Sequence, residues 1–253
     1  MKSWNKTQIE NHKIAGKKLA LIKDEFHSHI LSNVRMKKEI TEKECVDFIK
    51  KSYKKHGLVN DHKKEFAIVA FGPNTKEVHH FISTTTTHHL KPNTLILLDI
   101  WARLDQQNAP YADATFMFYV GKKVPEKIQK TWEVLISARD SAIGYIKKEI
   151  KKGKFPRGLD IDRVTHDTIG KAGLGNGIKH TIGHSLGFDS PHGKLPGINW
   201  REYSPILPNV GYTIEPGIYL ENFGMRSEID FYIDDQKRCI ITTPVQKDIE
   251  IIQ

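Results

Sequence analysis

Carboxylates that stand in or beside apolar, strand-like runs are the first feature of this sequence that could do chemistry. There are four of them: Asp99, Asp113, Glu215 and Glu228. An ionised carboxylate buried without a partner costs several kcal/mol, so a positive group should lie beside Asp99, which follows the apolar run 95–98. Each acid taken singly is most simply a strand-end cap or a salt-bridge partner. Together they indicate a shared site.

An imidazole accompanies these acids. His184 is flanked by Gly183 and Gly187, and glycines allow backbones to approach one another closely. A set of mostly oxygen ligands with one imidazole suits manganese, iron, cobalt or zinc. Two such ions, about 3 to 4 Å apart and bridged by carboxylates, can bind a water and stabilise a developing oxyanion. These residue types therefore suit a metal-dependent hydrolase.

Six short motifs then make a specific resemblance. In chain order they are 71–74 with His79 and His80, 98–99, 111–115, 183–187, 214–219 and 226–228. The same order is found in the family of methionine aminopeptidase, prolidase and aminopeptidase P, which have the pita-bread fold. Each motif is weak by itself, but six in register are specific. The chain resembles this metallopeptidase family, and most closely its Xaa-Pro aminopeptidase-like branch.

The resemblance implies a role for each acid. Asp99 would be a ligand of one divalent ion, His184 and Glu215 would be ligands of the other, and Asp113 and Glu228 would bridge the two. Manganese or cobalt is expected, with zinc or iron as alternatives. A metal-bound hydroxide would attack the scissile carbonyl of a peptide substrate, and Glu215 would transfer a proton.

Three further residues receive roles from the resemblance. His79 and His192 match imidazoles that contact the substrate or its tetrahedral intermediate, and Arg226 would orient the bridging carboxylates. His192 follows His184 by one residue more than is usual in the family, so an exposed loop histidine is the alternative interpretation of that position. His80, His88 and His89 are expected to be surface or structural residues.

The substrate is expected to be a peptide with proline in the second position. The segment 71–80 resembles the aminopeptidase P and prolidase version, whereas methionine aminopeptidase carries a cysteine in its side-chain pocket, where neither Cys45 nor Cys239 lies. Asp99 and Asp113 are three residues further apart than in the best-known relatives, so an enlarged loop over 101–110 is expected beside the pocket. A methionine aminopeptidase is the alternative enzyme.

Helices and strands alternate irregularly around these motifs. Apolar spacing predicts helices over about 6–32, 41–57 and 125–150, with a shorter one starting near 160. Strand-like runs cover 66–71, 94–101, 115–120, 212–220, 229–233 and 239–242. The late strands have no helices between them, which indicates an α+β class. We expect one domain over 1–253, with a curved antiparallel sheet from about residue 60 backed by helices.

Two other motif matches fail on their context. The segment 183–187 fits the G-x-S-x-G nucleophile elbow, but that motif needs a helix directly after Ser185, and prolines and glycines follow instead. No histidine follows His192 to complete the triad order Ser, Asp, His. The glycines at 173–177 resemble a dinucleotide loop but follow a predicted helix, so a helix C-cap is the better interpretation.

Charge and composition bound the remaining possibilities. The net charge is +9, but Lys outnumbers Arg and is spread over the helices, so nucleic acid is an unlikely partner. A non-catalytic peptide- or nucleic-acid-binding domain is the other functional class, and five matching ligands favour the enzyme. No apolar run approaches a membrane span and the first residues do not fit a secretory signal, so a cytoplasmic protein with two buried thiols is expected. Homodimerisation is left open.

Overall fold

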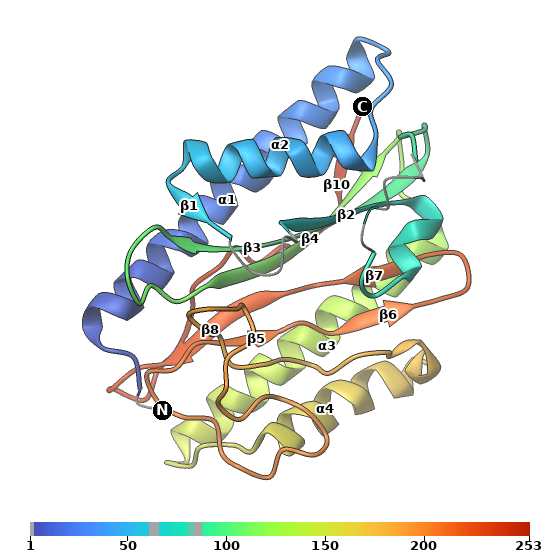
Figure 1. Ribbon diagram of the computed structural model, residues 1–253. Helices are drawn as coiled ribbons and strands as arrows, with labels where there is room; N and C mark the ends of the chain where they lie inside the picture. The colour runs from blue at the N-terminus through green and yellow to red at the C-terminus, as the bar shows by residue number, and fades with distance from the viewer. Residues whose placement is uncertain (1–2, 61–65, 81, 83–87) are drawn as a thin grey trace.

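The computed structural model describes residues 3–60, 66–80, 82 and 88–253. Strands lie between two helical layers, with α1 and α2 on one side and α3 and α4 on the other (Figure 1). The helices are α1 (Lys6–Arg35), α2 (Glu42–Lys55), α3 (Glu126–Lys151) and α4 (Gly158–Lys171), with 3₁₀ turns η1 (Gly72–Lys76) and η2 (Gly175–Gly177). The sequence predicted the four α-helices of the described residues, the first three from apolar spacing.

Capping residues determine where the first two helices begin. Asn5 accepts a hydrogen bond from the backbone N–H of Gln8, and the Gln8 side chain accepts one from the backbone of Asn5. Thr41 and Glu44 form the same reciprocal pair at the start of α2, as the capping-box motif predicted. The helix predicted over 125–150 begins one residue later, and Pro125 is the residue just before α3.

The strands form three hydrogen-bonded sheets. They are β1 (Leu58–Val59), β2 (Ala67–Phe71), β3 (Thr94–Leu104), β4 (Ala112–Val120), β5 (Tyr212–Ile214), β6 (Gly217–Tyr219), β7 (Gly224–Arg226), β8 (Ile229–Ile233), β9 (Cys239–Ile241) and β10 (Glu250–Ile252). The first sheet joins β1, β2, β3, β4 and β10, the second has the order β5-β8-β9, and the third pairs β6 with β7. The predicted antiparallel pairing is confirmed except for β4 and β10, which run parallel, and one continuous sheet is replaced by three.

The β3–β4 hairpin sets the positions of two predicted ligands. Asp99 lies opposite Thr115 and Trp101 lies opposite Asp113, and residues opposite each other in a sheet project from the same face. Asp99 lies inside β3, within the run predicted over 94–101, whereas Asp113 lies inside β4 although the sequence placed it before the run 115–120. The loop expected over 101–110 is shorter than predicted, because β3 continues to Leu104 and β4 begins at Ala112.

The two faces of the hairpin enter different cores. Even-numbered residues of β3, such as Leu98 and Ile100, pack in the core that contains α1 and α2. Odd-numbered residues, such as Leu97 and Trp101, pack in the core that contains α3. Asp99 projects from this second face, toward Arg226 at the end of β7. Side-chain alternation therefore directs the acids into the space between the sheets.

Two smaller expectations have clear outcomes. Cys45 is buried as predicted, but Cys239 is only half-buried, which corrects the expectation of two buried thiols. Within the ranges that the structure describes, the helices are too short or too polar to cross a membrane.

Candidate metal centre

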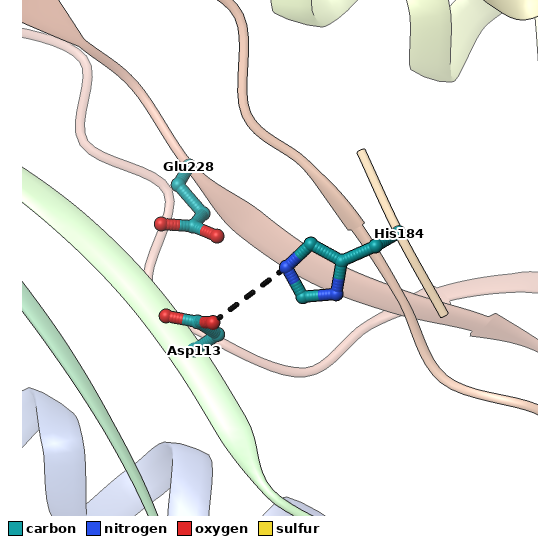
Figure 2. Close-up of side chains that lie close together, drawn as sticks. All are labelled: Asp113, His184 and Glu228. Atoms are coloured by element: carbon teal, nitrogen blue, oxygen red, sulfur yellow. Dashed lines mark ion pairs between the residues drawn. The ribbon is translucent and has the colours of Figure 1, made fainter. Parts of the chain in front are cut away.

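Three predicted ligands converge from distant parts of the chain. Asp113 comes from β4, His184 from the segment before β5, and Glu228 from the connection between β7 and β8. Each offers a ligand atom, and these atoms all lie within 4.8 Å of one another. Figure 2 shows the imidazole of His184 directed at the two carboxylates. This arrangement is the geometry expected of side chains that share a cation.

The imidazole of His184 has a defined tautomer. Its Nδ1 lies 3.0 Å from the carbonyl oxygen of Ser185, which can only accept, so Nδ1 carries the proton. The lone pair on Nε2 then faces Oε1 of Glu215 at 3.3 Å and Oδ2 of Asp113 at 3.9 Å. Burial, with the neighbouring His192, lowers the pKa of His184 to about 3. A neutral imidazole with a free Nε2 is the form that binds metals.

Thr213 in β5 holds His184 beside Glu215. The Thr213 hydroxyl accepts the backbone N–H of His184 at 3.0 Å and donates to Oε1 of Glu215 at 3.2 Å. The backbone N–H of Thr213 donates to the carbonyl of His184 at 2.9 Å. A Cβ at Gly183 would collide with the Thr213 carbonyl, so this close approach requires glycine. Pro216 then ends the strand pairing after Glu215.

Arg226 connects the remaining acids. Its Nη2 donates to Oδ2 of Asp99 at 2.5 Å, and its Nε donates to the hydroxyl of Thr115 at 3.1 Å. Thr115 in turn donates to Oε2 of Glu228 at 2.7 Å. Arg226 therefore contacts Asp99 directly and reaches Glu228, one of the two bridging carboxylates that it is expected to orient, only through Thr115.

Buried negative charge dominates the site. Burial raises the pKa of Asp113 and of Glu228 well above the usual range, and neighbouring carboxylates raise both further. Burial also raises the pKa of Glu215 to about 7. Oδ1 of Asp99 is buried and has no hydrogen-bond partner among the described residues. Divalent cations would offset this crowding and use the free oxygen, so the donor set fits metal ions.

The two predicted substrate-contacting histidines lie at the exposed edge of this buried cluster. The ring centroid of His192 is 4.1 Å from that of His184, so the extra residue in the loop does not separate them. His79 follows the turn η1. Burial raises the pKa of Asp99, and Arg226, followed by Thr115 and His79, opposes that rise. The carbonyl of Val78 accepts a hydrogen bond from Arg226 at 3.4 Å.

His180 and Tyr219 belong to the site although the sequence did not single them out. Nε2 of His180 lies 2.9 Å from the Tyr219 hydroxyl, and Nδ1 lies 3.8 Å from Oε2 of Glu215. Burial, followed by the charge of Arg226, lowers the pKa of His180 to about 3. Closeness in sequence to the candidate ligands could have identified both residues, because His180 precedes His184 by four residues and Tyr219 follows Glu215 by four.

The rejected nucleophile elbow is also rejected by the structure. Ser185 is buried and its hydroxyl donates to the carbonyl of Leu195 at 2.9 Å. An isolated bridge to Tyr212 occupies its backbone, and no helix follows it in the described chain. After α4, Gly173 has a positive φ of 75°, which agrees with the helix-end interpretation of the second glycine motif.

Comparisons with known proteins point to one family. The model of metallopeptidase family M24 matches residues 15–235. A peptidase of Staphylococcus epidermidis is 28% identical over 208 residues, which is 82% of this chain and 54% of that protein. The solved X-Pro aminopeptidase of Thermotoga maritima superposes with a TM-score of 0.83 at 25% identity, covering 99% of this chain and 64% of that one.

A second solved structure, the prolidase of Thermococcus sibiricus, gives a TM-score of 0.81 at 25% identity and covers 98% of this chain and 61% of that one. The chain spans about half the length of the curated relatives that it matches first. The shared region includes the strands and loops that carry the whole acidic cluster.

Proposed function

Because the chain belongs to metallopeptidase family M24 and has the α+β pita-bread fold that its motifs predicted, we propose that it is a dinuclear metal-dependent exopeptidase. Its reaction would be release of the N-terminal residue from peptides with proline in the second position. The observation that carries this proposal is the convergence of Asp113, His184 and Glu228 within 4.8 Å. One domain, 1–253, would hold the complete site.

Five side chains would hold the ions. Asp99 would bind one ion, His184 and Glu215 the other, and Asp113 and Glu228 both. Manganese or cobalt is proposed, with zinc or iron as alternatives. The ions would supply two effects, a lowered pKa for a bound water and polarisation of the scissile carbonyl.

The chain's own residues would position the substrate and move the proton. With a pKa raised to about 7 by burial, Glu215 suits exchange of a proton near neutral pH, where a general base or acid is most effective. His79 and His192, both exposed beside the buried acids, would contact the peptide carbonyl and the developing oxyanion. Arg226 would hold Asp99 and, through Thr115, Glu228 in place.

Two observations support the preference for proline. The solved relatives at 25% identity are named as an X-Pro aminopeptidase and a prolidase. A prolyl amide also lacks an N–H, so the enzyme would hold the substrate through its carbonyl and its free amine, and His79 would serve the carbonyl.

A comparison of peptides tests this proposal. The manganese-loaded protein should show a higher kcat/KM for Xaa-Pro-Xaa than for Met-Ala-Xaa, and Asp113→Asn should remove both activities. A preference of about tenfold or more for the methionine peptide, equivalent to about 1.4 kcal/mol of transition-state binding, would favour the methionine aminopeptidase alternative instead.

A further inference from the structure

Asp230 is a buried carboxylate that none of the roles above uses. It lies in β8 with no exposed surface, and its Oδ2 accepts the backbone N–H of Asp113 at 2.8 Å. β8 pairs with β5 and β9, whereas β4 pairs with β3 and β10, so the two strands belong to different sheets. The Asp230 side chain therefore joins the sheets at a point where strand pairing does not.

This link lies at the centre of the proposed ligand set. Asp230 follows Glu228 by two residues, and it lies opposite Thr213 in the β5–β8 register. Thr213 holds both His184 and Glu215. Asp230 thus connects the backbone of Asp113, one proposed bridging ligand, to β8, the strand that follows the other bridging ligand, Glu228.

Two hydrogen bonds fix the backbone of Asp230. Its backbone N–H donates to the hydroxyl of Thr243 at 2.7 Å, and its carbonyl accepts the backbone N–H of Thr242 at 2.9 Å. Because Thr242 and Thr243, which follow β9, bind the backbone C=O and N–H of Asp230, the position of its carboxylate is fixed.

His12 of α1 lies behind the carboxylate. Its Nε2 is 2.7 Å from the Thr242 hydroxyl and 3.9 Å from Oδ2 of Asp230, and its Nδ1 donates to the carbonyl of Tyr111 at 2.9 Å. Burial lowers the pKa of His12 to about 4, so the imidazole is neutral near pH 7 and offers Asp230 no positive charge. The hydrogen bond to Asp113 remains the close polar contact of this carboxylate.

We propose that Asp230 is a positioning residue for the metal centre, which fixes the backbone of Asp113 and so the separation of Asp113 from Glu228. The inference rests on the proposed function, because it assigns Asp230 to the ligands of that site. Two ions bridged by carboxylates need this separation held to about 0.5 Å, and residues that orient metal ligands typically contribute about 10- to 100-fold in affinity.

Two variants separate hydrogen bonding from charge. Asp230→Ala removes the acceptor, and we expect manganese affinity, measured by calorimetry, to fall by about tenfold or more. Asp230→Asn keeps a carbonyl acceptor without the charge and should stay within about threefold of the wild type. Unchanged affinity in Asp230→Ala, or an equal loss in both variants, would overturn the proposal. Should Asp230→Ala not fold, Asp230→Ser, whose hydroxyl is too short to reach the amide, replaces it.

A matched control is a side chain that contacts β4, the strand of Asp113, from the connection between β9 and β10. The side chain of Gln246 accepts the N–H of Met117 at 2.8 Å and donates to its carbonyl at 2.7 Å, four residues along β4 from Asp113. Gln246→Ala should lower the melting temperature and leave manganese affinity unchanged. If it weakens manganese binding as much as Asp230→Ala does, the effect of Asp230 is general destabilisation and the proposal is wrong.

Amide exchange of the metal-free protein tests the link without any ion. The N–H of Asp113, followed by NMR, should exchange slowly in the wild type and in Asp230→Asn, and at least about tenfold faster in Asp230→Ala. Equal exchange in the wild type and Asp230→Ala would refute the role of Asp230. A wild type that binds no metal but shows the expected exchange pattern would refute the proposed function alone.

Discussion

His184 donates its Nδ1 proton to the carbonyl oxygen of its own neighbour, Ser185, at 3.0 Å. Because that proton is committed, Nε2 is left as an acceptor facing Glu215 and Asp113. The backbone therefore selects the tautomer that a metal requires, before any ion is bound.

Replacing this imidazole should weaken metal binding without unfolding the protein. His184→Ala removes the one nitrogen donor proposed for the second ion, and we expect calorimetry to show loss of one binding event or at least a tenfold weaker one. His166→Ala is the matched control, because its side chain is 41% exposed on α4. Two full-affinity sites in His184→Ala would show that His184 is not a ligand.

Removing the charge of Arg226 should destabilise the metal-free protein. Arg226→Met leaves Asp99 buried without its cation, and breaking a buried pair in this way typically costs about 3 to 5 kcal/mol. The loss should be smaller at pH 5 than at pH 8, because burial already raises the pKa of Asp99 and a protonated acid needs no cation. Urea unfolding measures both values.

The control for Arg226 is an exposed ion pair. Arg157 donates to Asp160 near the start of α4 and is 48% exposed, so Arg157→Met should change stability little. A similar loss in the two variants, or an Arg226→Met loss that does not depend on pH, would contradict the assignment of Arg226 as the partner of Asp99.

The contribution of Glu215 to the stability of the metal-free protein should fall as pH rises from about 4.5 to about 7. Burial raises the pKa of Glu215 from its usual value to about 7, so in this window the folded state binds more protons than the unfolded state. The stability that Glu215 contributes is fully present below its pKa in the unfolded state and is lost as the pH rises through its pKa in the folded state. The difference in melting temperature between the wild type and Glu215→Gln, measured in chelator at several pH values, should show this decline, because it removes the opposite contributions of the buried histidines.

Manganese should reverse this dependence. Ions compete with protons for the same carboxylates, so the rise in melting temperature on adding manganese should increase with pH. Identical pH profiles for the wild type and Glu215→Gln, with and without the ion, would show that Glu215 does not titrate in this range.

Glu42 should control how firmly His79 is held. Its carboxylate is 2% exposed, accepts the N–H of Phe71 at 2.6 Å and lies 2.9 Å from Nε2 of His80. Glu42→Ala leaves these donors unsatisfied, and we expect about 1 to 3 kcal/mol of lost stability and a KM raised more than kcat is lowered. Glu39→Ala, at an 84% exposed side chain, is the control and should change neither. An unchanged KM in Glu42→Ala would refute the link to His79.

The sequence predicted the helices better than the strands. Apolar spacing and the Thr41–Glu44 capping box are local signals, so α1 to α4 appear where they were expected. Strand ends were misplaced after Trp101, where β3 continues to Leu104, and before Thr115, where β4 already includes Asp113 because a shared site can stabilise a carboxylate inside a strand. The three-residue strand β10 pairs with β4 across more than a hundred residues, and no local pattern marks it.

The motifs, which occur in the family's order, predicted which candidate ligands lie together. They did not predict the residues that join the site through long-range contacts. Asp113, His184 and Glu228 come together as the resemblance implied, and His192 lies against His184 despite its shifted spacing. Asp230 was not assigned a role from the sequence, because its contact with Asp113 depends on how two sheets meet. Such tertiary contacts leave no signature in a single sequence.

The most direct test of the account is a count of ions. Elemental analysis after manganese loading and removal of free ion should find about two manganese ions per chain in the wild type, and one or none in Asp113→Ala, which lacks a proposed bridge. A wild type that retains no ion after loading with manganese, cobalt or zinc would contradict the metallopeptidase assignment of these five side chains.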